Sequence, residues 1–321
     1  MKVGVFHPAL YLNGGAELVA LVVVNTLAQN GYKVILFTNK KVDQQETEKM
    51  LGEPIHSSVK TIVKPSLISP RTPLDVYHNV FRSIAFKKKC DILFDTYSNC
   101  FLPWTDIYYV HFPFVNQYLY APRFPYLKSC HPSLVAGLPY VFMEKNILNH
   151  DPNGKLIIAN SHFTANSIQQ FSKADIHVLY PPIQSTLFNK NSVGTLRKNL
   201  VVTVSRFGFG KGLEIIPYIA KLTEDHIKFV IIGVVHDQCV LQSIRDSIAF
   251  LDVPHKVDVL TNVSKQQIKQ ILESAKIYFH PTVNEHFGIS IAEAMAMGCI
   301  PVVHNSGGVK EFVPDNYRYN N

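Results

Sequence analysis

The most informative part of the sequence is Phe279–Val313, which reads FHPTVNEHFGISIAEAMAMGCIPVVHNSGGVKEFV. Its first apolar run leads into a loop that carries Glu285, and the helical segment Gly288–Gly298 is followed at once by the β-branched run Ile300–Val303. Strand, helix and strand in this order are typical of a βαβ unit, whose strands are parallel. Gly298 suits the helix end because it has no Cβ. The stretch therefore predicts an α/β domain.

The same alternation recurs from end to end, so we expect two doubly wound, Rossmann-like domains with parallel sheets, facing each other across a ligand-binding cleft. A length of 321 residues also favours two domains. We place the boundary at Pro182, giving residues 1–182 and 183–321, because Tyr180-Pro181-Pro182 precedes a polar segment without periodicity. The expected strands are Lys2–Phe6, Lys33–Thr38, Val59–Val63, Ile92–Phe94, Ile107–Val110, Lys155–Ala159, His177–Tyr180, Leu200–Ser205, Phe229–Gly233, Lys256–Leu260, Ile277–His280 and Ile300–Val303.

The composition excludes several classes of protein. Hydrophobic residues make up 47% of the chain and charged residues 17%, which excludes disorder. The net charge of +7 favours an acidic partner such as nucleic acid, an anionic lipid or a phosphorylated small molecule, and charge alone does not choose among them. The 5 cysteines form no CxxC pair and the 14 histidines show no ligand spacing, so no disulfide framework or metal site is expected. With no signal-peptide pattern and no apolar stretch of about 20 residues, the expected location is cytoplasmic.

The quoted stretch suits a ligand that carries a diphosphate. Glu285 lies in the loop and Glu293 inside the helix, so one acid stands on each side of the helix start. The first amides of a helix have no partner within it, so those of Gly288, Ile289 and Ser290 are candidates to bind a phosphate.

Cations and glycines elsewhere support the same chemistry. Arg206 and Lys211 follow the expected strand Leu200–Ser205, in a loop whose glycines would let both cations approach one diphosphate. Gly14 and Gly15 follow the first strand, so their backbone could also approach a phosphate. A dinucleotide site is the competing interpretation of this glycine pair, but the chain has no G-x-G-x-x-G.

These positions together resemble the nucleotide-sugar site of retaining glycosyltransferases of family 4, which have the GT-B fold. The E-x7-E spacing of Glu285 and Glu293, the R-x4-K pair of Arg206 and Lys211, and the Gly-Gly-x-Glu loop at Gly14 follow the family's order along nearly the whole chain. The resemblance implies that residues 1–182 form the acceptor-side domain and residues 183–321 the domain that binds the nucleotide sugar.

The resemblance also implies a role for each residue. Arg206 and Lys211 would stabilise the departing nucleoside diphosphate, Glu293 would bond the ribose hydroxyls, and Glu285 would hold the transferred sugar. His111, in Tyr109-Val110-His111-Phe112-Pro113, resembles a family histidine that touches the donor sugar. Members of this family use basic side chains and helix ends in place of a divalent cation, so neither a metal nor another cofactor is expected.

Within the family, Asn284–Ile289, His304–Gly308 and Val110–Pro113 are similar to segments of the α-1,2-mannosyltransferases that extend a dolichol-linked oligosaccharide on the cytoplasmic side of a membrane. GDP-mannose is therefore the first donor candidate, and UDP-glucose, UDP-N-acetylglucosamine and UDP-galactose are the alternatives. The expected acceptor is a lipid-linked or other glycan, and nucleic acid is not an expected partner. Two other functions stay open: a non-catalytic partner subunit that binds nucleotide sugar, and a sugar-nucleotide epimerase.

Two stretches depart from the family pattern. Members usually continue past Gly307–Glu311 through another βα unit and a final helix, so we expect a second domain that is short at its C-terminus. The aromatic, proline-broken stretch Val110–Phe142 is either an irregular part of the core or a surface that faces an apolar acceptor or a membrane. Lys87–Lys89, Arg123 and Lys128 are the candidates for contact with an anionic membrane surface.

Overall fold

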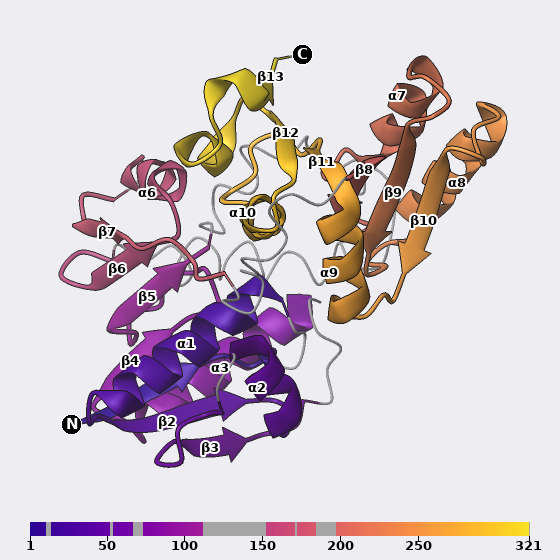
Figure 1. Ribbon diagram of the computed structural model, residues 1–321. Helices are drawn as coiled ribbons and strands as arrows, with labels where there is room; N and C mark the ends of the chain where they lie inside the picture. The colour runs from indigo at the N-terminus through magenta and orange to yellow at the C-terminus, as the bar shows by residue number, and fades with distance from the viewer. Residues whose placement is uncertain are drawn as a thin grey trace. The chain divides into compact units, whose positions relative to one another are not determined.

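The computed structural model describes residues 1–10, 14–51, 54–66, 73–111, 152–170, 172–183 and 197–320. These ranges are called the described part of the chain. The chain divides into two compact units, Met1–Pro182 and Ile183–Asn321, and each is treated by itself (Figure 1). Both units are layered α/β structures built on a parallel sheet.

The first unit has a seven-stranded sheet in the order β3-β2-β1-β4-β5-β6-β7, in which every neighbouring pair is parallel. The alternating side chains of its strands supply both layers of core: Val3 and Val5 of β1 pack with α1, whereas Phe6 packs with Phe86 of α3. The elements are β1 (Lys2–Phe6), α1 (Gly15–Gln29), β2 (Lys33–Thr38), α2 (Gln44–Leu51), β3 (Lys60–Val63), α3 (Pro73–Lys87), β4 (Ile92–Asp95), β5 (Ile107–Val110), β6 (Leu156–Ala159), α6 (His162–Gln169) and β7 (Ile176–Val178).

The second unit has a six-stranded parallel sheet in the order β10-β9-β8-β11-β12-β13. Helices α9 and α10 cover one face and helices α7 and α8 the other, as Figure 1 shows in orange, brown and yellow. The elements are β8 (Lys198–Val204), η6 (Leu213–Ile215), α7 (Ile216–Leu222), β9 (Lys228–Gly233), α8 (Gln238–Phe250), β10 (Val257–Thr261), α9 (Lys265–Ser274), β11 (Ala275–His280), α10 (Ile289–Ala296), β12 (Ile300–His304), η7 (Gly307–Glu311), η8 (Asp315–Tyr317) and β13 (Arg318–Tyr319).

The expected strands are present, and their ends differ from the sequence prediction by no more than two residues. Strand β13 was not predicted, because two residues show no periodicity. It pairs with β12 through Val303↔Arg318 and His304↔Tyr319, and the Asn305 amide donates to the Tyr319 carbonyl at 2.8 Å. Residues 112–151, which include most of the aromatic stretch with Arg123 and Lys128, lie outside the described part of the chain.

The strand order of the second unit fixes where a ligand can bind. The chain leaves β8 toward β9 on one side and returns to β11 on the other, so the carboxyl ends of β8 and β11 form the switch point of the sheet. The loops that follow these two strands, residues 205–212 and 281–288, therefore start side by side. At the opposite, amino end of β8 and β11, Arg197 donates to the carbonyls of Ala275 and Met297 at 2.7 and 2.5 Å, which ties the start of these strands to the end of α10.

Candidate functional site

An ion pair joins the two switch-point loops of the second unit. The Nζ atom of Lys211 lies 2.8 Å from Oε2 of Glu285, and the two side chains are 23% and 14% exposed. These residues are 74 positions apart in the sequence, and each belongs to the loop after one of the two adjacent strands. The structure thus brings together two of the residues that the sequence predicted for one site.

Glu285 is held at both oxygens. Nε2 of His280 lies 3.0 Å from Oε2, and the His286 amide donates to Oε1 at 3.2 Å. Burial of the Glu285 carboxyl works to raise its pKa, but the attraction of Lys211 and the hydrogen bond with His280 outweigh burial and hold the pKa well below its usual value. Glu285 is therefore a carboxylate at neutral pH.

The backbone of Lys211 is fixed by the same loop. The hydroxyl of Thr282 donates to the Lys211 carbonyl at 3.1 Å. Gly212 has a φ of 66°, and a Cβ there would lie 3.2 Å from the Pro281 carbonyl oxygen, so a glycine allows the two loops to pack this closely. Backbone and side chain of Lys211 are both bound to residues that follow β11.

The Ser306-Gly307-Gly308 segment holds the Glu285 loop from its other side. The Gly308 amide donates to the Glu285 carbonyl at 2.8 Å, and the Asn284 amide donates to Oγ of Ser306 at 2.7 Å. A Cβ on Gly308 would lie 2.0 Å from the His286 carbonyl oxygen, which no real contact allows. The S-G-G sequence is therefore explained by close backbone packing against the acidic loop.

Helix α10 begins at the end of this loop. Its N-cap, Gly288, has a φ of 92°. Within the described part of the chain, the amides of Gly288, Ile289 and Ser290 donate no backbone hydrogen bond, as expected for the first turn of a helix. The three amides, with the positive end of the helix dipole, lie directly after the Glu285 loop, where an anion is favoured.

Glu293 lies one turn into α10 and differs from Glu285 in its surroundings. Its backbone carbonyl accepts from the Met297 amide at 3.1 Å, but its carboxyl makes no hydrogen bond or ion pair with another residue of the described part of the chain. Burial raises the pKa of Glu293 to about 7, against a smaller opposing effect of Lys265. The two acids of the E-x7-E pattern therefore have opposite pKa shifts, and they are suited to different work.

Arg206 is exposed and lies two residues after the end of β8. Burial, together with the charges of Lys211 and Arg206, lowers the pKa of His286 to about 4 against the opposing charge of Glu285. Both cations thus act on the same imidazole, which places the Arg206 charge near the Lys211–Glu285 pair.

The remaining predicted residues belong to the first unit. Gly14 is the N-cap of α1, and its amide donates to Oε2 of Glu17 at 2.8 Å. Gly15 is the first residue of α1. His111 directly follows β5, where its amide donates to Oδ1 of Asn99 at 2.8 Å and its carbonyl accepts from the Thr164 hydroxyl at 3.2 Å. The part that these residues play toward a donor stays a prediction.

Sequence reasoning missed His280 and His286. Both touch Glu285, yet neither lies in a ligand-type spacing with another histidine or cysteine. The one available signal was the position of His280 as the last residue of an apolar strand, at the carboxyl edge where ligands bind.

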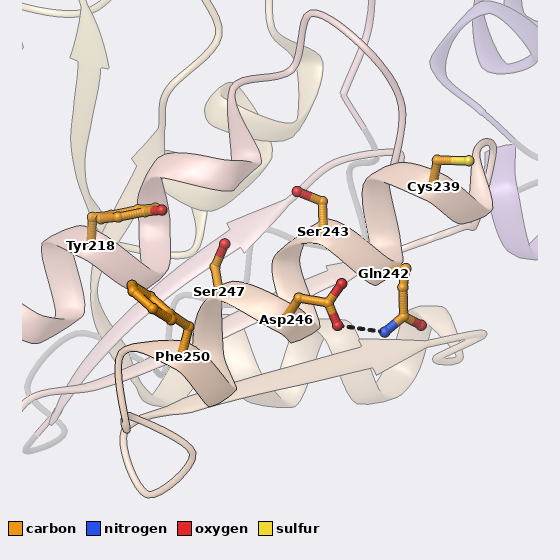
Figure 2. A pocket seen from close by; sticks show the side chains of 7 residues that line it. All are labelled: Tyr218, Cys239, Gln242, Ser243, Asp246, Ser247 and Phe250. Atoms are coloured by element: carbon orange, nitrogen blue, oxygen red, sulfur yellow. Dashed lines mark hydrogen bonds between the residues drawn. The ribbon is translucent and has the colours of Figure 1, made fainter.

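An open hollow of about 500 Å³ in the second unit lies elsewhere, along α7 and α8 (Figure 2). Its polar groups are hydroxyls, a thiol, an amide and a carboxylate, and Gln242 donates to Asp246 at 2.8 Å. Because it carries no cation, it does not suit a diphosphate. It is lined by Tyr218, Cys239, Gln242, Ser243, Asp246, Ser247 and Phe250.

Among the residues that the structure describes, no group of three or more His, Cys, Asp or Glu side chains gathers closely enough to hold a metal ion. None of the helices found in those residues combines the length and the apolar character needed to cross a membrane.

Comparison with protein families identifies the chain. The model described as "Glycosyl transferases group 1" matches residues 186–320. The model described as "Glycosyltransferase Family 4" matches residues 13–186, which is more than half of the chain. The chain belongs to glycosyltransferase family 4. The family resemblance inferred from the sequence is thereby confirmed.

Relatives of this family 4 chain include proteins from several organisms that are named GDP-Man:Man(3)GlcNAc(2)-PP-Dol alpha-1,2-mannosyltransferase. The one from Dictyostelium discoideum is 30% identical over 177 residues, covering 49% of this chain and 35% of the relative. The one from Mus musculus is 30% identical over 175 residues, covering 48% and 35%. The gpi3 subunit of phosphatidylinositol N-acetylglucosaminyltransferase from Schizosaccharomyces pombe is 21% identical over 94% of this chain. The chain thus spans about a third of the length of the two mannosyltransferases.

Two solved structures, of WaaG and HepE, have the same fold as this chain. WaaG, a glycosyltransferase involved in lipopolysaccharide biosynthesis, has a TM-score of 0.74 at 15% identity, covering 99% of this chain and 85% of WaaG. HepE from Anabaena in complex with UDP and glucose has a TM-score of 0.65 at 15% identity, covering 100% and 85%. The expected α/β fold with two Rossmann-like domains of the GT-B type is confirmed.

Proposed function

We propose that the chain is a retaining hexosyltransferase that moves mannose from GDP-mannose to a lipid-linked oligosaccharide. The family 4 match supports glycosyl transfer, and the two mannosyltransferase relatives support the donor and acceptor class. The observation that carries the proposal is the Lys211–Glu285 pair at the switch point of the second sheet, beside the first amides of α10.

The proposed chemistry stabilises the leaving group. When the bond from the sugar to the diphosphate breaks, negative charge develops on the phosphate oxygens. Lys211, which is bound to Glu285, and the α10 amides supply positive charge in fixed positions, and the exposed Arg206 adds a further cation. Preorganised charge of this kind lowers the barrier because little solvent has to reorganise. Retention follows if the acceptor hydroxyl attacks on the face that the diphosphate leaves, with a phosphate oxygen taking its proton. Two carboxylates that act as acid and nucleophile, as in glycosidases, are not part of this proposal.

The acids divide the recognition of the donor. We assign Glu293 to the ribose hydroxyls, since its carboxyl has no partner within the described part of the chain. Glu285 is assigned to the transferred sugar, with its orientation set by Lys211 and His280. Gly14, Gly15 and His111 are assigned to the donor from the first unit on the family resemblance. We expect Glu293→Gln mainly to raise the KM for donor and Glu285→Gln mainly to lower kcat.

A lipid-linked acceptor implies work at a membrane surface, and we propose peripheral binding at its cytoplasmic face. Of the basic residues predicted for this contact, Lys87 is paired with Asp106 at 2.5 Å. Lys88 and Lys89 directly follow it, and the other two candidates lie outside the described part of the chain.

The test of the donor site is thermal unfolding with GDP, UDP and their sugars. A ligand at about 100 times its Kd adds roughly 2.7 kcal/mol of stability. Lys211→Ala should reduce the shift. The matched control is Lys276→Ala on β11, which removes the same charge from the amino end of the sheet, where Lys276 donates to Asn199 at 2.6 Å. The donor-site assignment is wrong if none of the nucleotides raises the unfolding temperature of the wild-type chain. It is also wrong if the Lys211→Ala and Lys276→Ala variants respond alike.

A further inference from the structure

His280 ends β11 and is held in a buried position. Its side chain is 3% exposed. Its ring stacks on that of Tyr278, with 6.2 Å between centroids and 13° between planes. The position of its ring nitrogens is therefore set by the strand and by Tyr278, before any contact with a loop is made.

One nitrogen of this ring is bound and the other is not. Nε2 lies 3.0 Å from Oε2 of Glu285, the oxygen that also accepts from Lys211 at 2.8 Å. A carboxylate oxygen only accepts hydrogen bonds, so Nε2 carries the hydrogen. Nδ1 is buried without a hydrogen-bond partner in the described part of the chain. A histidine that served the core alone would be expected to pair both nitrogens, since an unpaired buried polar atom is unfavourable.

The contact bears on Lys211 through Glu285. An ammonium has three N–H groups, and within the described part of the chain the side chain of Lys211 donates only to Glu285. One N–H is thus used to orient the ammonium, and two remain for a ligand. The direction in which they point depends on where Oε2 is fixed, and His280 is the rigid, buried group that fixes it.

We propose that His280 is a positioning residue, which holds the Glu285 carboxylate through Nε2–H so that the Lys211 ammonium presents its two other N–H groups to the donor diphosphate. This inference rests on the proposed function, in which Lys211 binds that diphosphate. His280 itself touches neither donor nor acceptor in this scheme.

Two substitutions separate the two ring nitrogens. In His280→Gln the side-chain amide reaches the place of Nε2 and keeps a donor to Glu285. In His280→Asn the amide reaches only the place of Nδ1 and loses that donor. Both variants remove the ring and its stacking on Tyr278, so they share the structural cost. The difference in GDP affinity between the two variants therefore measures the effect of the hydrogen bond to Glu285.

The experiment measures the Kd of GDP by calorimetry, with kcat and KM once a donor is found. We expect His280→Gln to bind within about threefold of wild type and His280→Asn to bind about 10-fold more weakly, the effect of one hydrogen bond. In a chain that already carries Lys211→Ala, His280→Asn should change Kd by less than about twofold, because His280 acts through Lys211. A purely structural role would weaken binding equally in both backgrounds.

The outcomes separate the two proposals. If wild type binds neither GDP nor UDP, the proposed function falls and this inference with it. If wild type binds and the Asn and Gln variants do not differ, or if His280→Asn is as damaging without Lys211, the inference alone is overturned. Should either variant fail to fold, ¹⁵N-histidine NMR of the wild-type chain decides: His280 should be an Nε2–H tautomer whose signals move on addition of GDP, and an Nδ1–H tautomer or unmoved signals would overturn the inference.

Discussion

Replacing Glu293 by glutamine should stabilise the second unit in a pH-dependent way. Burial raises the pKa of Glu293 to about 7, from 4.5 for an ordinary glutamate. Between these two values the folded chain keeps a proton that the unfolded chain has lost, so stability falls as pH rises through this window and stays lower above it. The neutral glutamine has nearly the same shape and does not carry this cost.

The magnitude follows from the shift. Each unit of pKa difference corresponds to about 1.4 kcal/mol, so a change from 4.5 to about 7 corresponds to at most about 3 kcal/mol. The gain in unfolding free energy of Glu293→Gln over wild type should be small at pH 4.5 and should approach this value at pH 8. GDP binding at pH 7 should also release protons, since ribose hydroxyls that donate to Glu293 favour its ionised form.

The assay is urea unfolding followed by far-UV circular dichroism at pH 4.5, 6 and 8. Fluorescence of Trp104, the single tryptophan, marks the transition of the first unit. Glu214→Gln removes the same charge from η6 and serves as the control. A gain for Glu293→Gln that is the same at all three pH values would refute the pKa argument. If Glu293→Gln were less stable than wild type at pH 8, the ionised Glu293 carboxylate would have a stabilising partner, which contradicts the argument above.

Four further outcomes are expected. Gly308→Ala should lower stability by about 1–3 kcal/mol and weaken GDP binding, because its Cβ would lie 2.0 Å from the His286 carbonyl oxygen. The control is Gly208→Ala, whose Cβ would meet nothing closer than 3.6 Å and which should be near neutral in thermal unfolding. Arg197→Met should cost about 2–3 kcal/mol in urea unfolding, because the carbonyls of Leu272, Ala275 and Met297 lose a charged donor. Transferase activity should persist in EDTA, and a strict need for Mg²⁺ or Mn²⁺ would contradict the metal-free expectation. Co-sedimentation with anionic liposomes should fall as salt rises, and a protein that stays in the supernatant at low salt would argue for a soluble acceptor.

The fold class and most strand positions follow from local patterns in the sequence. Alternating apolar runs and helical patterns are local properties, and a parallel sheet needs such runs wherever a strand is buried on both faces. The same reasoning placed Lys211 and Glu285 after strands, and parallel strands bring such loops to one edge. It could not find β13, whose two residues are held by β12 and not by a pattern of their own.

Only the tertiary structure decided which side chains meet and what each contact does to them. Glu285 and Glu293 are the same residue type eight positions apart, yet the pKa of one is held well below its usual value and that of the other rises to about 7. Lys211 and His280 compensate the charge of the partly buried Glu285, whereas the carboxyl of the half-buried Glu293 has no hydrogen-bond partner in the described part of the chain. Burial and long-range pairing depend on how β8 and β11 come together. Lys211 and Glu285 are 74 positions apart in the sequence, and no local sequence pattern predicts that they meet.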